Sequence, residues 1–460
     1  MKISTVALLI VLLAAVLAAQ GPASPDLSSD PRVRWLQKEA ISVRTVDPAD
    51  EDFRDLQPLK KVIGDAQIVM LGEISHGDGT SFLAKSRLLK FLHQQMNFDV
   101  LVFESGFYDM SKAWESIRQG QEPVAAVQRS MMGVWRRSPQ VTSLLNYVGT
   151  SAKSLRPLAL AGFDMQPHAI STASLLSELD ALTARLGIAS DVTTPGSPAR
   201  AIAVNLLTNK YYGKPAIPLP DTSARKSFSD GLDVLRERLA SAATATTEAE
   251  TGFWRQVLLS SLKSYAEMVW SYREFGEKDP NWSAFNARDK QGADNLLWLA
   301  DHQYRGKKLI VWGATMHLLR HASTIEATIN PADPQQAYTN MVPLGEEVWR
   351  RIGPRAYVIG FTCYEGSMGI GDPADKENSW HSDVRKDQDP SIELEELLNA
   401  ARFDYALVDF RKPAARGEWL NTPIVSRPLA SQGMRAVWPN VLDAMFFIRV
   451  MEPNLATFPR

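Results

Sequence analysis

Short apolar runs rich in Val, Ile and Leu recur along the chain, and each ends in polar or small residues. Runs of this length are typical of strands buried on both faces, as in a parallel sheet covered by helices. Helical patterns lie between them, for example over Phe82–Met96. The sequence therefore predicts an α/β fold, with a central, mostly parallel sheet flanked by helices and joined by right-handed crossovers. The runs are Gln67–Glu73, Asp99–Glu104, Pro157–Asp164, Lys308–Gly313, Ala356–Phe361, Tyr405–Phe410 and Ala444–Arg449.

Residues 170–304 differ from the rest, because they carry long helical patterns and almost no strand signal. We interpret this stretch as a helical insertion or cap that packs over the sheet. The α/β catalytic core then comprises residues 30–169 and 305–460. The helical patterns of the insertion are Leu175–Leu186, Ser227–Thr244, Glu248–Phe275 and Asn286–Leu299.

Residues 1–24 have the features of a signal peptide. Lys2 supplies a positive charge, residues 6–17 are apolar throughout, and Ala18 and Ala19 are small residues suited to cleavage. The apolar stretch is shorter than the roughly 20 residues that a membrane span requires. We therefore expect an exported protein, periplasmic or secreted, with no stable membrane insertion after removal of the leader. A retained N-terminal anchor is the alternative.

Charge and cysteine content exclude several classes of protein. The chain has 50 basic and 52 acidic residues, a formal net charge of −2. Nucleic acids require clustered excess Lys and Arg, so no nucleic-acid partner is expected. Cys363 is the single cysteine, which excludes an internal disulfide and a zinc site built on several thiolates.

Titratable residues follow the predicted strands at their carboxyl ends, where open α/β sheets bind their ligands. The first strand leads into Glu73 and His76, the second ends at Glu104, the third ends at Asp164, and the fourth leads to His317. Separate strands thus deliver two glutamates, an aspartate and two histidines toward one edge of the sheet.

Three kinds of site are compatible with these residues. A histidine beside a carboxylate is the usual general-base pair, because the carboxylate fixes the tautomer and stabilises the charged ring. The set His76, His317, Glu73 and Glu104 could instead bind zinc or iron in a metal-dependent hydrolase. A binding protein for haem or another hydrophobic ligand is the third hypothesis, with histidine as axial ligand. The chain lacks the Gly-x-Ser-x-Gly, Walker and Gly-x-Gly-x-x-Gly motifs, which argues against serine hydrolases and nucleotide enzymes.

The motifs at these strand ends resemble those of the erythromycin esterase family. The resemblance extends over roughly residues 55 to 450, with the motifs in family order, which makes the set specific. The matching segments are Leu71–Gly77, Phe103–Phe107, Trp135, Gly162–Gln166, Ala287–Lys290, Ala293–Trp298, Val311–His317, Pro343–Gly345 and Ile359–Thr362.

The resemblance implies a hydrolase that opens macrolide lactones or cleaves related esters with an activated water, without a required metal or other cofactor. Its substrate would be a small-molecule ester or lactone. His76 stands where the family places its general base, with Glu73 beside it, and Glu104 and His317 match the other essential carboxylate and histidine. Residues expected to contact the substrate are Lys85, Asp164, Arg288 and Asp289.

Two positions depart from the family pattern. Lys85 occupies a position where the family commonly has arginine, and Ala314 one where it often has an additional histidine. Lysine keeps the charge but loses the planar fork that grips a carboxylate or carbonyl.

In the expected mechanism His76 takes a proton from water, Glu73 or Glu104 orients the ring, and His317 or Lys85 stabilises the oxyanion.

Overall fold

The computed structural model describes residues 27–208, 219–276, 282–327, 338–372, 374, 379–385, 392–411 and 418–458. The predicted signal peptide, residues 1–24, lies outside these residues. Among the helices that are described, none combines the length and the apolar composition that crossing a membrane requires.

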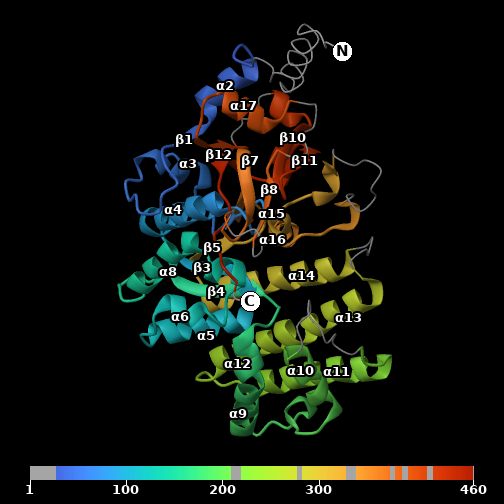
Figure 1. Cartoon of the computed structure of the whole chain (residues 1–460). Coiled ribbons are helices and arrows are strands. Elements are labelled where there is room, and N and C mark those ends of the chain that lie inside the picture. Colours follow the sequence, from blue (N-terminus) through green and yellow to red (C-terminus); the bar gives the residue numbers. More distant parts are fainter. Residues whose placement is uncertain are drawn as a thin grey trace, which may run out of the picture.

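A nine-stranded sheet runs through the upper part of the molecule in Figure 1. Its order is β1-β9-β12-β7-β2-β5-β3-β4, and β8 pairs with β7. The strands from β12 to β4 are parallel to one another, whereas β9 is antiparallel to both β12 and β1. The bounds are β1 Ile41–Val43, β2 Ile68–Leu71, β3 Phe98–Gly106, β4 Ala159–Asp164, β5 Lys308–Trp312, β7 Ala356–Ile370, β8 Trp380–Asp383, β9 Tyr405–Asp409 and β12 Ala444–Met451.

The α/β fold with a mostly parallel sheet is confirmed, and every predicted run forms a strand of this sheet. The physical reason is burial. All residues of β2, β3 and β4 are buried, so these strands need apolar side chains on both faces rather than an alternating pattern. Ile68 of β2 pairs with Leu309 of β5 on one side and with Ala356 of β7 on the other.

Helices cover both faces of the sheet. From β2 through β3 to β4 the chain moves toward one edge, and from β4 through β5 to β7 it moves back. Right-handed crossovers in opposite directions place their helices on opposite faces. Accordingly α4 (Gly79–Met96) packs against α8 (Pro139–Ser151), and α14 (Ser283–Trp298) packs against α16 (Leu344–Ile352). Helix α5 (Phe107–Arg118) packs on β4.

The elements between β4 and β5 are helical wherever the structure describes them, and α9 to α13 lie together at the bottom of Figure 1. Short π-helical segments stand before α9, between α12 and α13, and after α14, at Ser171–Leu175, Leu258–Ser264 and Leu299–Gln303. That these residues form a separate cap domain stays a prediction. The helices are α9 Leu176–Leu186, α10 Pro198–Thr208, α11 Thr222–Ser241, α12 Glu248–Val257 and α13 Tyr265–Phe275.

A second, three-stranded sheet was not predicted. It has the order β10-β11-β6 and is antiparallel. Its strands are β10 (Ile424–Leu429), β11 (Gln432–Ala436) and β6 (Glu326–Ala327). The remaining helices are α2 Pro31–Glu39, α3 Leu59–Ile63, α6 Pro123–Val127, α7 Gly133–Arg136, α15 Thr315–Leu318, α17 Leu394–Ala400 and α18 Trp438–Val441.

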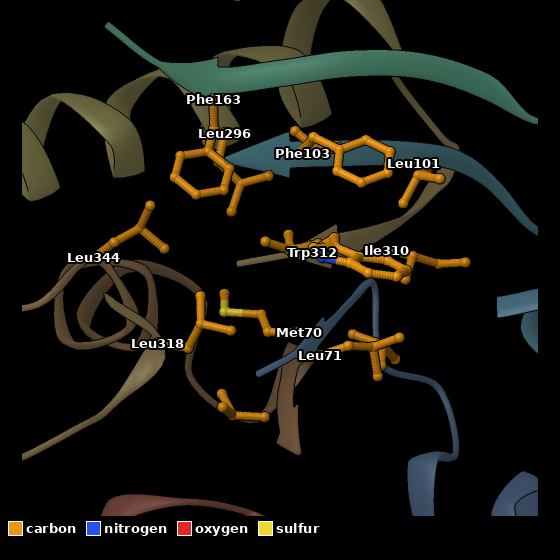
Figure 2. Packing of buried hydrophobic residues seen from close by; sticks show 14 of the residues in the cluster. Met70, Leu71, Leu101, Phe103, Phe163, Leu296, Ile310, Trp312, Leu318 and Leu344 are labelled. Carbon is orange, nitrogen blue, oxygen red and sulfur yellow. The ribbon is translucent and has the colours of Figure 1, made fainter. Parts of the chain in front are cut away.

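Aromatic side chains pack directly beneath the carboxyl ends of the central strands, as Figure 2 shows. The rings of Phe103 on β3 and Trp312 on β5 lie 5.4 Å apart, centroid to centroid. Phe163 of β4 and Leu344 of α16 are also buried in this region. This packing gives the residues that follow the strands a rigid apolar floor.

Candidate active site

The predicted site residues sit where the parallel strands end. Glu73 follows β2, Glu104 lies in β3, and Asp164 ends β4. The chain after β2 passes very close to the chain after β5 at this edge. A Cβ atom at Gly72 would lie only 2.4 Å from the Thr315 hydroxyl. Glycine at position 72 therefore lets the end of β2 pass beside the turn that follows β5.

Glu73 is the centre of the first group of side chains. The carboxylate is fully buried, and its Oε1 bonds His76 Nδ1 at 2.7 Å. The Lys85 ammonium donates to Oε2 at 2.7 Å, and the Trp135 indole N–H donates to Oε1 at 3.3 Å. The His76 and Trp135 rings also meet edge to face at 5.4 Å. Glu73 is thus held by three donors from three separate segments.

The charges in this group set the protonation of His76. Burial opposes ionisation of Glu73, but Lys85 and His76 outweigh it and lower the pKa of this carboxyl. Burial likewise disfavours the His76 imidazolium, yet the hydrogen bond and charge of Glu73 prevail and raise the pKa of His76 above 6.5. Because the Glu73 carboxylate can only accept, neutral His76 carries its proton on Nδ1 and presents a lone pair on Nε2.

Asp78 holds the loop on which His76 lies. Its carboxylate is buried and accepts the backbone N–H groups of Ile74 at 3.0 Å and Ser75 at 3.1 Å. Burial, with the nearby charge of Glu73, raises the pKa of Asp78 to about 7. The segment between Glu73 and Asp78 is therefore a closed turn that fixes the main chain of the histidine.

Glu104 is the centre of the second group. Its Oε1 accepts from the Arg288 guanidinium at 2.8 Å and lies 3.2 Å from His317 Nε2. Its Oε2 accepts the backbone N–H of Ala314 at 2.9 Å. The same guanidinium donates to Asp164 at 2.7 Å. Arg288 thereby bridges the ends of β3 and β4, and it is 16% exposed.

His317 lies between two carboxylates. Asp289 Oδ1 bonds its Nδ1 at 2.7 Å, and Glu104 lies at its Nε2. Burial disfavours the charged ring, but Asp289 and Glu104 outweigh burial and raise the pKa of His317 to about 10. Burial also opposes ionisation of Glu104, whose pKa the charges of His317 and Arg288 nevertheless hold well below 4.5. His317 is consequently a buried imidazolium at neutral pH, and Phe285 stacks on its face at 5.0 Å.

Successive amides after β5 join the two groups. The N–H of Ala314 donates to the Glu104 side chain, and the N–H of Thr315 donates to the Glu73 carbonyl at 2.9 Å. The groups are close enough for the charges of Glu104 and His317 to act on the pKa of His76. The structure therefore brings all the residues expected at the site together at one edge of the sheet.

The predicted site residues differ in how far their side chains are exposed to solvent. The His76 side chain is 34% exposed, whereas the Lys85 side chain has no exposed surface. Lys85, expected from the sequence to contact substrate, instead lies beneath Glu73 with its ammonium 4.1 Å from the centre of the Trp312 ring. Asp164 and Asp289 are also buried, and they hold Arg288 and His317. All three side chains are thus buried against other residues of the site.

Trp135, Asp78 and Phe285 are in direct contact with the site residues, although the sequence alone predicts no role for them. Trp135 was part of a matching motif, and its position in that motif was the available signal. Asp78 and Phe285 carried no such signal, because their contacts depend on how the turns close. The Asp78 carboxylate accepts a main-chain N–H group, and the Phe285 ring stacks on the His317 ring. The spacing of residues along the sequence reveals neither contact.

The glutamates of the site form ion pairs with basic side chains of the protein itself. Glu73 faces Lys85, and Glu104 faces Arg288. Within the described part of the chain, no three His, Cys, Asp or Glu side chains are grouped so that they could hold a metal ion. The four residues of the metal-site hypothesis therefore form two separate ion-paired groups and do not converge on one point.

Comparison with known sequences identifies the family. The sequence model of the erythromycin esterase family matches residues 93–450. The chain belongs to the erythromycin esterase family. A curated relative, "Putative hydrolase YbfO" of Bacillus subtilis (strain 168), is 27% identical over 444 residues, which cover 92% of this chain and 91% of that protein. Erythromycin esterase type II of Escherichia coli is 37% identical over 73 residues, 16% of this chain and 17% of the relative.

Solved structures share the fold of this erythromycin esterase family member. A crystal structure described as a succinoglycan biosynthesis protein superposes with a TM-score of 0.70 at 19% identity, covering 94% of this chain and 100% of that one. A variant of the erythromycin esterase EreC in its open conformation superposes with a TM-score of 0.64 at 17% identity, covering 90% and 98%. Family membership and the relatives together support a hydrolase that acts on a small molecule.

Proposed function

We propose that this family member hydrolyses a carboxylic ester or lactone by direct attack of a water molecule that His76 activates, with no required metal. One observation carries the proposal: His76 Nδ1 is bound to Glu73 at 2.7 Å while the ring keeps 34% of its surface exposed. The bond to Glu73 directs the basic lone pair to Nε2, the nitrogen left to accept a proton from water.

Positive charge for the developing oxyanion comes from the second group. His317 is an imidazolium flanked by Glu104 and Asp289, and the Arg288 guanidinium lies 3.3 Å from its Nε2. Cationic donors fixed in a low-dielectric site stabilise a tetrahedral oxyanion without having to reorganise. We assign the oxyanion to this pair rather than to Lys85, whose side chain has no exposed surface.

A hydrolysis screen tests the proposed function. Purified protein is incubated with macrolides and simple carboxylic esters, and ring opening or acid release is followed by mass spectrometry. We expect the wild type to hydrolyse at least one ester or lactone, and we expect the His76→Asn variant to lose most of that activity. Turnover of no ester, together with haem uptake and a sharp Soret shift, would overturn the proposal in favour of a ligand-binding protein.

The pH dependence of kcat/KM should reflect His76. Protonated His76 has no lone pair to accept a proton, and its pKa is raised above 6.5 by Glu73. We therefore expect kcat/KM to rise with pH through an inflection above 6.5, and to fall again near the His317 pKa of about 10 as that cation is lost. In Glu73→Gln the acidic inflection should move to lower pH. An acidic inflection at or below 6.5 in the wild type would count against His76 as the base.

Chelation should leave activity unchanged. Lys85 and Arg288 already neutralise the carboxylates that a metal would need. We expect kcat after prolonged dialysis against a chelator to remain within about twofold of its starting value, because no step of the proposed reaction requires a Lewis acid. Stoichiometric metal in the purified protein, with activity lost on chelation and restored by zinc or iron, would contradict this expectation.

We further propose export of the protein, to the periplasm or the medium, on the basis of the N-terminal sequence. Lys2 and the apolar stretch that follows are typical of a cleaved leader. Intact-mass measurement of the protein from cell fractions tests this. A product that begins near residue 20 in the exported fraction is expected, and a full-length product in the membrane fraction would favour the retained anchor.

A further inference from the structure

The C-terminal segment Glu452–Phe458 crosses the loops that carry the site. In Figure 1 the red segment that follows β12 runs toward the middle of the molecule. The segment begins by pairing with the start of α4, where the Glu452 N–H donates to the Thr80 hydroxyl at 2.8 Å. Gln140 of α8 then donates to the Pro453 carbonyl at 3.0 Å. The tail is therefore fastened on both sides of the site loops.

Asn454 is the most constrained residue of this segment, since its side chain is fully buried. Its amide NH₂ donates to the His76 carbonyl at 3.0 Å and to the Val134 carbonyl at 2.9 Å. Its Oδ1 accepts the N–H of Ala456 at 3.0 Å. Both amide protons and the amide oxygen are thus used, and only an asparagine in this orientation satisfies all three partners.

The main chain of Asn454 adds contacts to the same loops. Its N–H lies 2.9 Å from the Gly77 carbonyl and 3.0 Å from the Gly369 carbonyl, and its own carbonyl accepts the N–H of Gly371 at 2.9 Å. A side chain at Gly77 would not fit, because its Cβ atom would lie 2.7 Å from the Gly369 nitrogen. Asn454 therefore ties the end of β7 to the turn that holds His76.

We propose that Asn454 is a positioning residue for the His76 base, a role that rests on the proposed function. Its two amide protons join the main chain at His76 to the main chain at Val134, the neighbour of Trp135. The side chains of His76 and Trp135 meet on one atom, Glu73 Oε1. A single amide group thus fixes the spacing of two segments whose side chains share one carboxylate oxygen.

Substitution of Asn454 should loosen this spacing. In Asn454→Ala both carbonyls lose their donor, and in Asn454→Ser at most one donor remains. Displacement of a catalytic group by about 1 Å can lower the rate about 10²-fold. We expect kcat to fall about 10- to 100-fold in the alanine variant and less in the serine variant, with KM within about twofold of wild type. Leu455→Ala, whose parent side chain is 41% exposed, is the matched control and should keep wild-type kcat.

The pKa of His76 provides a readout that loss of stability alone would not move. The charges of Glu73 and Glu104 raise the pKa of this ring, and the charge of His317 lowers it. When His76 shifts away from Glu73, its pKa should move toward 6.5. The shift is measured by NMR titration of the histidine ring protons, with His76→Asn identifying the signal, so it requires no substrate and remains valid if the protein hydrolyses no ester.

The outcomes separate the two proposals. A shifted His76 pKa in folded Asn454→Ser, without any ester turnover in the wild type, would support the positioning role and overturn the proposed reaction. Wild-type kcat and wild-type His76 pKa in folded Asn454→Ala or Asn454→Ser would overturn the positioning role. Circular dichroism spectra of an unfolded chain for both variants would also overturn it, because the contacts of Asn454 would then serve the fold as a whole.

Discussion

Replacing His76 with asparagine is expected to lower kcat by about 10²–10⁴-fold, the usual contribution of a positioned general base. Asparagine can still hydrogen-bond to Glu73 but cannot take a proton from water. Since the His76 side chain is already 34% exposed, the substitution should leave the thermal unfolding midpoint nearly unchanged. The measurement is kcat on an ester that the wild type hydrolyses, with circular dichroism to verify the fold.

His302→Asn is a suitable control for this experiment. His302 lies at the end of the segment that follows α14, is exposed, and contacts the Trp298 ring at 5.5 Å. It should retain wild-type kcat because it belongs to neither group of site residues. Near-normal turnover by His76→Asn would show that another group acts as the base.

Replacing Lys85 with methionine is expected to have the largest effect on stability. Lys85 and Glu73 form an ion pair with no exposed surface on either side chain. Methionine fills the space of the lysine stem but leaves Glu73 with His76 and Trp135 as its donors. Breaking a buried pair by removing one partner typically costs about 3–5 kcal/mol, because the remaining charge is uncompensated. The measurement is the free energy of unfolding in urea at neutral pH.

Two variants show whether burial is the cause. Lys112→Met removes a lysine that is 27% exposed and pairs with Glu115 and Glu178, and such a partly exposed pair should contribute less than about 1 kcal/mol. The double variant Glu73→Gln, Lys85→Met removes both charges and should regain much of the stability that the single variant loses. Equal losses in Lys85→Met and Lys112→Met would refute a special role for the buried pair.

The central sheet could be predicted because its strands are buried on both faces. Such strands need uninterrupted apolar runs such as Ile68–Leu71, and these runs are visible in the sequence. The small sheet could not. Its strand β10 contains Pro428 and a buried Arg427 whose charge is paired with Glu393, a composition that resembles a loop. Strand β8, Trp380–Asp383, is largely exposed and depends on pairing with β7.

The candidate site was predictable to the extent that it follows the strand ends. Glu104 lies near the end of β3, and Glu73 and His317 follow the ends of β2 and β5, so the topology brings them to one edge of the sheet. The sequence does not reveal which charged side chains of the site pair with each other. Lys85 carries a charge that suits a substrate, yet the first turns of α4 place it under Glu73. Asn454 lies far from His76 along the chain, and no local pattern marks their contact.

Arg288 and Asp289 are consecutive residues of α14, yet one bridges Glu104 and Asp164 while the other holds His317. Both sets of contacts come from adjacent positions of one helix and therefore depend on a single helical register. Insertions upstream of α14 leave that register intact, whereas one residue added between Ser283 and Arg288 would turn the pair away by about 100°. A chimaera that exchanges α9 to α13 should therefore be joined ahead of α14, so that the contacts of Arg288 and Asp289 stay unchanged.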